Sequence, residues 1–446
     1  MEKKNFKNVL MKKTNNNEAI RVHAIINLII FIIISIFYQI KTNTLFDSFY
    51  FQHLSNITLK IKGIGESYIF GHEQYHNFTQ INYLKDVYIN GERQETIEYK
   101  YYFNQINNTV ELIWNDGIKD CKNMFRSCSN ITEINMSYFD TSLVTNMYCM
   151  FQWCSSLTSL DLSNFDTSLV QNMQYIFNSC SSLTSLDLSY FNTSLVTSML
   201  FMFHSCSKLT SLNLSHFNTS LVIDMFCMFY SCSSLTLLDL TNFNTSLVQD
   251  MYGMFYSCSS LTSLDLSYFN TSQAINMGFM FNGCSSLTSL DLSHFNTSSV
   301  KTMKSMFNFC RELTSLDLSY FNTSLVISMD FMFNYCSKLT TLNLSHFNTS
   351  LVMDMYCMFN GCSSLTLLDL SNFNTSLVTN MNSMFYNCKN LEFINLNNFD
   401  ERSLLDSTDN YQDMFKNVPE NVVVCINEPL PQSKILPQIK KKIVMS

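Results

Sequence analysis

Hydrophobic and polar residues follow one pattern that repeats every 26 residues along most of the chain. In each copy three leucines follow a cysteine, as Leu157, Leu160 and Leu162 follow Cys154. The last two leucines alternate with polar residues, which is the spacing of a strand with one buried face. Before the cysteine stand a Met-Phe pair and, three residues earlier, another Met. These steps of three and four predict a short helical segment.

The repeat continues without insertion or deletion, and one copy cannot bury its own apolar face. A constant period in this range is typical of a solenoid, in which each coil covers its neighbour. We therefore predict an α/β solenoid over residues 110–426, with one parallel β-sheet and a cap at each end. The cysteines that mark the period are Cys128, Cys154, Cys180, Cys206, Cys232, Cys258, Cys284, Cys310, Cys336, Cys362 and Cys388.

The N-terminal region differs from the repeats in composition. Residues 1–23 are polar and basic, and residues 24–40 (AIINLIIFIIISIFYQI) are almost wholly apolar. Seventeen helical residues span about 26 Å, so we predict a transmembrane signal anchor; a cleaved signal peptide and a buried helix are the alternatives. The excess of Lys and Arg before the span places a cytosolic tail at 1–23 and the repeats outside the cell, or secreted if the segment is cleaved.

Two further segments flank the solenoid. Residues 42–109 contain segments of strand-like alternation, which predict a small β-rich domain. The pair Asn90-Gly91 predicts a hairpin between two of them, Val87–Asn90 and Ile97–Phe103. Val110–Trp114 is interpreted as a half-coil that begins the stack. Residues 427–446 are rich in Pro and Lys and are expected to form a loosely ordered tail.

Charge and composition exclude some classes of function. The net charge is −8, and the repeats contain no basic stripe, so nucleic acid is not an expected partner. The chain has no phosphate-binding loop, dinucleotide fingerprint or nucleophile elbow, and we expect neither a cofactor nor an enzyme.

The repeat resembles a known family. The run LTSLDLSNFDTS, followed by Val, Met and MFxxC, is similar to the BspA-like leucine-rich repeats of bacterial and protist surface proteins. Unlike the commonest leucine-rich repeats, this chain has Phe165 and its equivalents three positions after the LxL motif, where Asn or Cys is usual. The resemblance implies a cell-surface location and binding or adhesion to an extracellular protein or glycan. A structural coat or spacer without a specific ligand is the alternative.

Two rows of residues are candidates for the binding face. Residues seven after the cysteine form an acidic row, which either binds a cation or polar partner or is simply solvated. Residues ten after the cysteine form an aromatic row, whose variation suits a recognition surface but also an unconstrained exposed site. The candidate ligand-binding residues are Asp161, Asp187, Asp239, Asp265, Asp291 and Asp317 in the acidic row, and Tyr190, His216, Tyr268, His294, Tyr320 and His346 in the aromatic row.

Two other features have less to do with the expected binding. The cysteine column has no CxxC pair for zinc, and we expect buried free thiols, with disulfides as the alternative. Asp140, Asp166 and Asp400 share a column with most of the N-glycosylation sequons, so a turn is the shared role of that column. The sequon asparagines are Asn56, Asn77, Asn107, Asn192, Asn218, Asn244, Asn270, Asn296, Asn322, Asn348 and Asn374.

One motif belongs to metalloenzymes. His72, Glu73 and His76 form HExxH, with Glu95 as a conceivable third zinc ligand. The chemistry requires both histidines on one helix face, whereas the flanking segments are strand-like. A zinc peptidase is therefore only a remote alternative.

Overall fold

The computed structural model describes residues 55–72, 77–115, 117–404, 410–426, 433–435, 437 and 443–445. The predicted cytosolic tail and signal anchor lie outside these residues, as does most of the predicted tail at 427–446. No helix in the described part is long and apolar enough to cross a membrane. Residues 56–446 form one compact unit.

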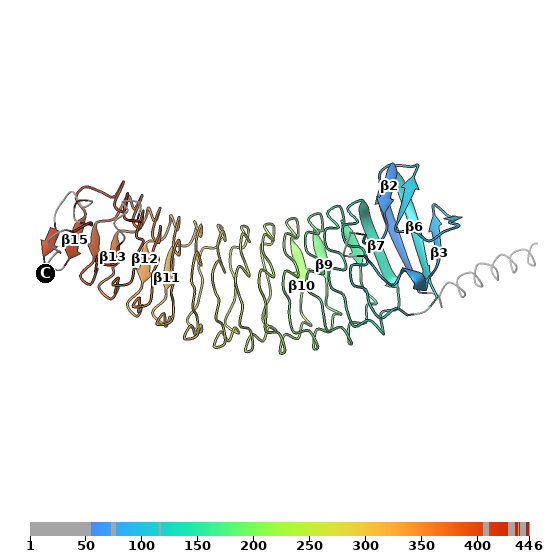
Figure 1. Cartoon of the computed structure of the whole chain (residues 1–446), viewed down its shortest axis with the longest axis horizontal. Coiled ribbons are helices and arrows are strands. Elements are labelled where there is room, and N and C mark those ends of the chain that lie inside the picture. Colours follow the sequence, from blue (N-terminus) through green and yellow to red (C-terminus); the bar gives the residue numbers. More distant parts are fainter. Residues whose placement is uncertain are drawn as a thin grey trace, which may run out of the picture. The chain divides into compact units, whose positions relative to one another are not determined.

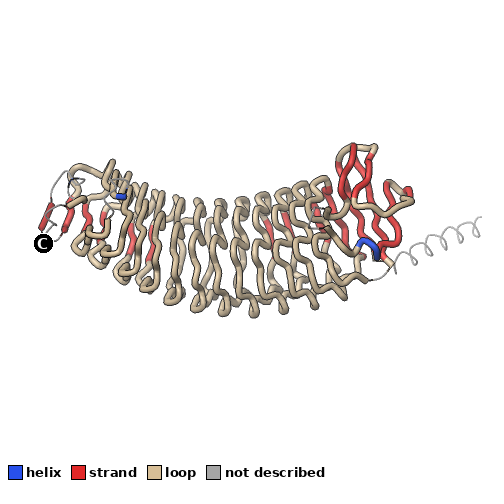
Figure 2. The backbone as a smooth tube through the Cα atoms, viewed as in Figure 1, coloured by secondary structure: helices blue, strands red, loops and turns tan. Residues whose placement is uncertain are grey.

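From about residue 118 the chain winds into successive coils, and Figures 1 and 2 show them lying one after another. Short strands of some neighbouring coils pair in parallel with a register of one repeat, as Ser185 pairs with Ser211 and Ser315 with Thr341. They form several short sheets and not the one parallel sheet that we predicted, because the described coils between Asn213 and Ser315 contain no strand. A second set of parallel bridges joins residues eight before the cysteines, such as Asp224 and Asp250. The strands of the coils are β7 (Ile131–Tyr138), β8 (Ser159–Asp161), β9 (Ser185–Asp187), β10 (Ser211–Asn213), β11 (Ser315–Asp317), β12 (Thr341–Asn343), β13 (Leu367–Asp369) and β14 (Phe393–Asn395).

The prediction of a short helix in each coil is wrong, and the fold is a β-solenoid rather than an α/β solenoid. The described residues contain no α-helix. The segment before each cysteine is a chain of tight turns, in which the residues five and one before the cysteine have positive φ, such as Cys227 (51°) and Ser231 (57°). A turn of four residues brings residues three apart together just as a helix does, so the spacing alone does not distinguish them.

Hydrogen bonding explains why the turns replace a helix. The amide groups of Cys227, Phe229 and Ser231 donate to carbonyl groups of the next coil, whereas those of Met228 and Cys232 donate back within their own turns. A helix would use every amide inside the segment. The turns leave alternate amides for the neighbouring coil, which joins the coils on this side as well.

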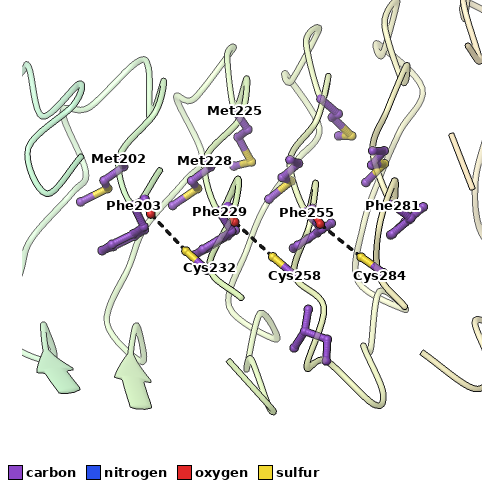
Figure 3. Close-up of a cluster of buried hydrophobic side chains, with 14 of the residues drawn as sticks. Met202, Phe203, Met225, Met228, Phe229, Cys232, Phe255, Cys258, Phe281 and Cys284 are labelled. Carbon is purple, nitrogen blue, oxygen red and sulfur yellow. Dashed lines mark hydrogen bonds between the residues drawn. The ribbon is translucent and has the colours of Figure 1, made fainter. Parts of the chain in front are cut away.

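Columns of identical side chains fill the interior. The phenylalanines three before the cysteines stack along the solenoid, for example Phe203 and Phe229 with ring centroids 5.5 Å apart and an angle of 5° between the rings. Figure 3 shows this file beside the methionines and cysteines. Phe70 stacks on Phe125 at one end and Phe415 packs on Phe385 at the other. The aromatic file therefore continues into both caps.

Each series thiol from Cys154 onward is a hydrogen-bond donor. Cys232 Sγ donates to the carbonyl of Phe203, 3.1 Å away in the preceding coil, and Cys258 donates to that of Phe229 (Figure 3). All sixteen cysteines are free, and all but Cys425 are buried. The thiols are buried and free, as predicted, and those of the series from Cys154 to Cys388 point at carbonyl groups and not at one another. Burial raises the pKa of the Cys232 thiol well above its usual value.

The N-terminal strands continue the sheet of the solenoid. β1 (Asn56–Lys62) lies between β6 (Asn107–Trp114) and β7 and is antiparallel to both. Val110–Trp114 is thus part of an antiparallel strand, not the half-coil that we expected. The other elements are β2 (Gly65–Tyr68), η1 (Ile81–Tyr83), β3 (Leu84–Ile89), β4 (Glu92–Arg93) and β5 (Lys100–Phe103).

The predicted hairpin is present, but its second strand, β4, begins directly after the turn and earlier than we expected. Ile89 pairs with Glu92 across Asn90-Gly91, and both turn residues have positive φ. β5, which covers part of the expected second strand, pairs instead with β2. At the other end β15 (Val423–Ile426) is parallel to β14, and β16 (Ile443–Met445) is parallel to β15.

Candidate binding surfaces of the solenoid

The acidic row closes a turn in each coil. One oxygen of Asp187 accepts the amide of Ser189 at 3.0 Å, and Asn213 accepts the amide of Ser215 in the same way at 3.1 Å. Asp and Asn can replace each other here because the turn needs only this acceptor oxygen. The hydrogen bonds to Ser189 lower the pKa of Asp187. The same causes lower the pKa of Asp239, Asp265, Asp291 and Asp317.

The carboxylates of this row therefore have a structural partner already. Asp161 also accepts the amide of the residue two further on, Ser163. Among the described residues, no group of three or more His, Cys, Asp or Glu side chains is placed to hold a metal ion. The arrangement gives no support to a cation site along this row.

The aromatic row divides into two kinds of residue. Its asparagines fold back onto the solenoid, as Asn164 Nδ2 donates to the carbonyl of Ser137 and Asn242 Nδ2 to that of Ser215. Its tyrosines extend into solvent, with exposed fractions of 67% for Tyr190, 63% for Tyr268 and 65% for Tyr320. His216, His294 and His346 are exposed as well. The structure thus leaves six exposed rings between residues 190 and 346.

These rings do not stack on one another: no ring contact joins members of the aromatic row within the described coils. Two of the histidines have a polar neighbour, since Ser215 Oγ lies 3.4 Å from His216 Nδ1 and Ser345 Oγ lies 3.2 Å from His346 Nδ1. The faces of the rings remain open for contact with a partner.

A second surface, which the sequence analysis missed, lies on the tight turns. We call it the turn face: the residues six, five, two and one before each series cysteine. Many are aromatic and stack between coils; Phe226 lies on Tyr252 with centroids 5.0 Å apart, and Tyr230 on Tyr256 at 4.2 Å. Such rings cover each other's faces and stabilise the stack. These positions vary strongly between copies, and that variation is the signal that could have revealed them.

A groove of about 590 Å³ runs along one edge of the turn face. Trp153 and serines on both sides of the series cysteines line it, from Ser127 to Ser231. Among these serines, Ser181 donates from Oγ to the carbonyl of Ser155 in the preceding coil. No charged side chain is part of the lining of the groove.

The zinc motif falls mostly outside the described residues. Glu73 and His76 are not among them, and the ring of His72 lies against Tyr68 and Tyr99, at centroid distances of 5.4 Å and 5.2 Å. Glu95 is exposed. The described residues add nothing in favour of a zinc peptidase.

The sequon column lies at another corner of the coil. Asn192 and Asn218 are exposed, and each accepts the amide of the serine two residues on; Asp166 does the same. The turn predicted for this column is present. The threonines of the sequons are buried, as Thr193 is at 0% exposure. Whether sugars are attached remains a prediction.

The family profile described as "Mycoplasma protein of unknown function, DUF285" matches residues 119–237, 228–316 and 309–423, which is more than half of the chain. The chain belongs to this family. The three DUF285 matches together cover nearly the whole solenoid. No curated protein matches the chain.

Three solved structures are similar to this DUF285 protein in part. The pneumococcal vaccine antigen PcpA is 11% identical, with 71% of each chain covered and a TM-score of 0.28. The functional domain of InlJ from Listeria monocytogenes, which includes a cysteine ladder, is 15% identical, with 69% of this chain and 66% of that one covered and a TM-score of 0.20. TLR13 in complex with ssRNA13 is 16% identical, with 72% and 64% covered and a TM-score of 0.20. No family of enzymes is among these matches.

Proposed function

We propose that this protein is a non-catalytic binding protein of the BspA-like kind, displayed at a cell surface by its N-terminal segment. It recognises an extended extracellular protein or glycan through the aromatic row. The apolar segment 24–40 supports membrane anchoring, and secretion follows if that segment is cleaved.

One observation carries the proposal: exposed, unstacked rings occupy the same position in six of seven consecutive coils. Large exposed aromatic side chains are costly to keep in water and contribute much of the binding energy at interfaces. Tyr also provides contact area with little loss of side-chain entropy. The rings are held on a rigid stack whose coils are joined by hydrogen bonds on several sides, so binding requires little reorganisation.

The acidic row supports this role indirectly. Its carboxylates lie three residues before the aromatic positions and remain exposed in most coils, as Asp187 and Asp317 do. Exposed charge at the edge of a contact favours the encounter of partners and contributes less to final affinity. We assign the acidic row to this outer part of the interface.

The test is a variant in which Tyr190, His216, Tyr268, His294, Tyr320 and His346 are replaced by Ala. The matched control replaces the exposed residues five after the cysteine in the same coils, which are Ser185, Ser211, Ser263, Ser289, Ser315 and Thr341. Both variants and the parent are applied to intact cells and to protein and glycan arrays. Circular dichroism melting checks that both variants fold.

We expect the aromatic variant to bind at least tenfold more weakly and the control to bind like the parent. Equal binding by the aromatic variant would show that this row is not the recognition surface. An array on which the parent protein binds nothing would favour the structural coat or spacer. Protease treatment of intact cells tests the location, because repeats outside the cell are accessible to it.

A further inference from the structure

A row of partly exposed leucines runs along the solenoid, fifteen residues after the series cysteines. We call it the leucine ridge. In five consecutive coils it consists of Leu143, Leu169, Leu195, Leu221 and Leu247, each exposed by 39–46%. It resumes three coils later with Leu325, Leu351 and Leu377, exposed by 42–47%. Single exposed leucines are ordinary, but a continuous apolar row of this length indicates a contact surface.

The residues two places further along widen the ridge. Val144 and its equivalents between the two columns are buried, so the flanking residues point outward together. This second column includes Ile223, Ile327 and Met353, with exposed fractions of 48%, 45% and 50%. The ridge is therefore up to two apolar side chains wide.

A lipid surface is a poor match for the ridge. Segments that lie on membranes combine an apolar face with several Lys or Arg residues. Two columns flank the leucines: the serines directly before them and the residues two places after them. Between residues 142 and 379 these two columns contain one basic residue, Lys301. Nor are there aromatic side chains in these columns. The composition favours a protein surface instead.

The spacing of the ridge selects the protein surface that it fits. Its side chains recur once per coil, at about 4.8 Å, which is the distance between paired strands. An apolar row with the same spacing packs along its whole length without losing register. The chain itself presents such a row, so a second copy of this chain is the matching partner.

The interruption of the ridge fixes how two copies align. Gln273 and Ser299 occupy the two coils without leucine. A twofold axis between these coils places Leu247, Leu221 and Leu195 of one copy opposite Leu325, Leu351 and Leu377 of the other. In the leucine column the polar residues Gln273 and Ser299 then meet at the centre. In the second column the same axis places Ile223 opposite Met353 and Thr197 opposite Thr379, whereas Ile275 faces Lys301 and Gln249 faces Ile327.

We propose that the leucine ridge joins two copies of this chain side by side and antiparallel, with the twofold axis between the coils of Gln273 and Ser299. Eight coils of each copy overlap, and every coil supplies its serine, its leucine-column residue and its second-column residue. Three residues from each of eight coils give a count within the range of about 20–30 residues that each partner contributes to a stable interface. The shared surface is isologous, as closed twofold dimers require.

The test uses the full chain in detergent, with Cys425 replaced by Ser because it is the one cysteine that is not buried. Two differently tagged chains carry Leu221→Cys and Leu351→Cys, and a short bismaleimide is added to each alone and to a mixture. We expect a cross-linked dimer containing both tags in the mixture. Either chain alone gives little product, because identical positions lie five coils, or about 24 Å, apart across the axis.

A second variant replaces Leu195, Leu221, Leu247, Leu325, Leu351 and Leu377 by Ser, the residue that the chain itself has at 299. In sedimentation experiments we expect the parent to be dimeric and this variant monomeric, with the same melting temperature. A monomeric parent, or equal cross-linking of Leu221→Cys with itself, overturns the proposal. So does a dimer that survives the serine substitutions, which would point to association through residues 24–40. If the parent is monomeric and binds lipid vesicles, and the serine variant does not bind them, the ridge is a lipid-binding surface instead.

Discussion

Thr219 forms two hydrogen bonds to the same residue of the next coil. Its Oγ1 accepts the amide of Asn244 at 2.7 Å and donates to the carbonyl of Asn244 at 2.9 Å. Thr219 is 1% exposed. One hydroxyl thus satisfies both backbone groups of a residue at a corner where no strand pairs. The equivalent threonines, from Thr141 to Thr375, are all buried. The same two bonds are formed by Thr167, Thr193, Thr323 and Thr375, and each of the others forms one of the two.

Thr219→Val should therefore be strongly destabilising, although the two side chains have nearly the same shape. The substitution removes the partner of the amide and of the carbonyl of Asn244, both in part-buried hydrogen bonds, at a cost of about 1–2 kcal/mol each. We expect the free energy of unfolding to fall by about 2–4 kcal/mol in urea denaturation. Thr219→Ser keeps the hydroxyl and loses a methyl group, so a loss of only about 1 kcal/mol is expected. Equal losses for the two variants would contradict this role for the hydroxyl.

The cysteine column predicts a steep alkaline transition. Burial raises the pKa of the thiols of Cys154, Cys206, Cys284 and Cys388 to about 12, above the ordinary value of 9. Unfolding exposes thiols that ionise near pH 9. The stability that they contribute is complete below about pH 9 and is lost as the pH rises toward 12. Urea midpoints measured from pH 7 to pH 11 should stay level at first and then fall steeply.

Thiol labelling gives an independent check of the same column. At pH 8 the half-exposed Cys425 should react first with iodoacetamide, and the series cysteines should react only on unfolding. Mass spectrometry of the labelled peptides distinguishes the two groups. Labelling of Cys232 or Cys258 at the rate of Cys425 would show that the stacked coils open readily.

The tight turns predict opposite effects of two substitutions at one site. Ser231 has a φ of 57°, in the left-handed region that favours glycine. Two other coils have glycine at this position, Gly283 and Gly361. Ser231→Gly should raise the free energy of unfolding by about 0.5–1 kcal/mol, and Ser231→Val should lower it by about 1–2 kcal/mol. Thermal melting of both variants measures this, and stabilisation by Val would contradict the turn geometry.

The acidic row predicts a change in acid stability without a change at neutral pH. Hydrogen bonds from the serine or threonine two residues on lower the pKa of Asp187, Asp239, Asp265, Asp291 and Asp317. Their contribution to stability is present above about pH 4 and is lost as the pH falls through the lowered pKa values. Replacing all five by Asn keeps the acceptor oxygen, so the melting temperature at pH 7 should change little.

Below pH 4 the same variant should lose stability more slowly than the parent, because its turns no longer depend on ionised groups. Melting curves at pH 7, 4 and 3 make the comparison. Replacing the five residues by Ala removes the acceptor as well and serves as the control, which should melt lower at every pH. A large loss in the Asn variant at pH 7 would mean that the charge itself stabilises the fold.

The sequence alone predicted the coils, their register and the buried columns. A strict 26-residue period lets Cys154, Leu157 and their equivalents cover one another once the coils stack. The local conformation before each cysteine was predicted wrongly. The steps of three and four between Met147, Met150 and Phe151 are shared by a helix and by successive turns. Only the carbonyl groups of the next coil, which accept the amides of Cys149 and Phe151, favour the turns.

The candidate surfaces were predicted only in part. The sequence identified the aromatic row, because its variation stands out beside the constant leucines. It could not show that Asn164 folds back while Tyr190 remains free, since the acceptor for Asn164 is the carbonyl of Ser137 in another coil. The same holds for the turn face, where the rings of Tyr230 and Tyr256 meet only after the coils have stacked.

The amino-acid sequence by itself therefore determined which side chains enter the interior and which neighbours they have, because a constant repeat fixes both once coils stack. The tertiary structure decided what the polar groups do. Whether a hydroxyl, a thiol or a backbone amide has a partner depends on the coil beside it, and that coil is a full repeat away along the chain. For the same reason, only the stacked coils showed which rings and leucines remain exposed for a partner.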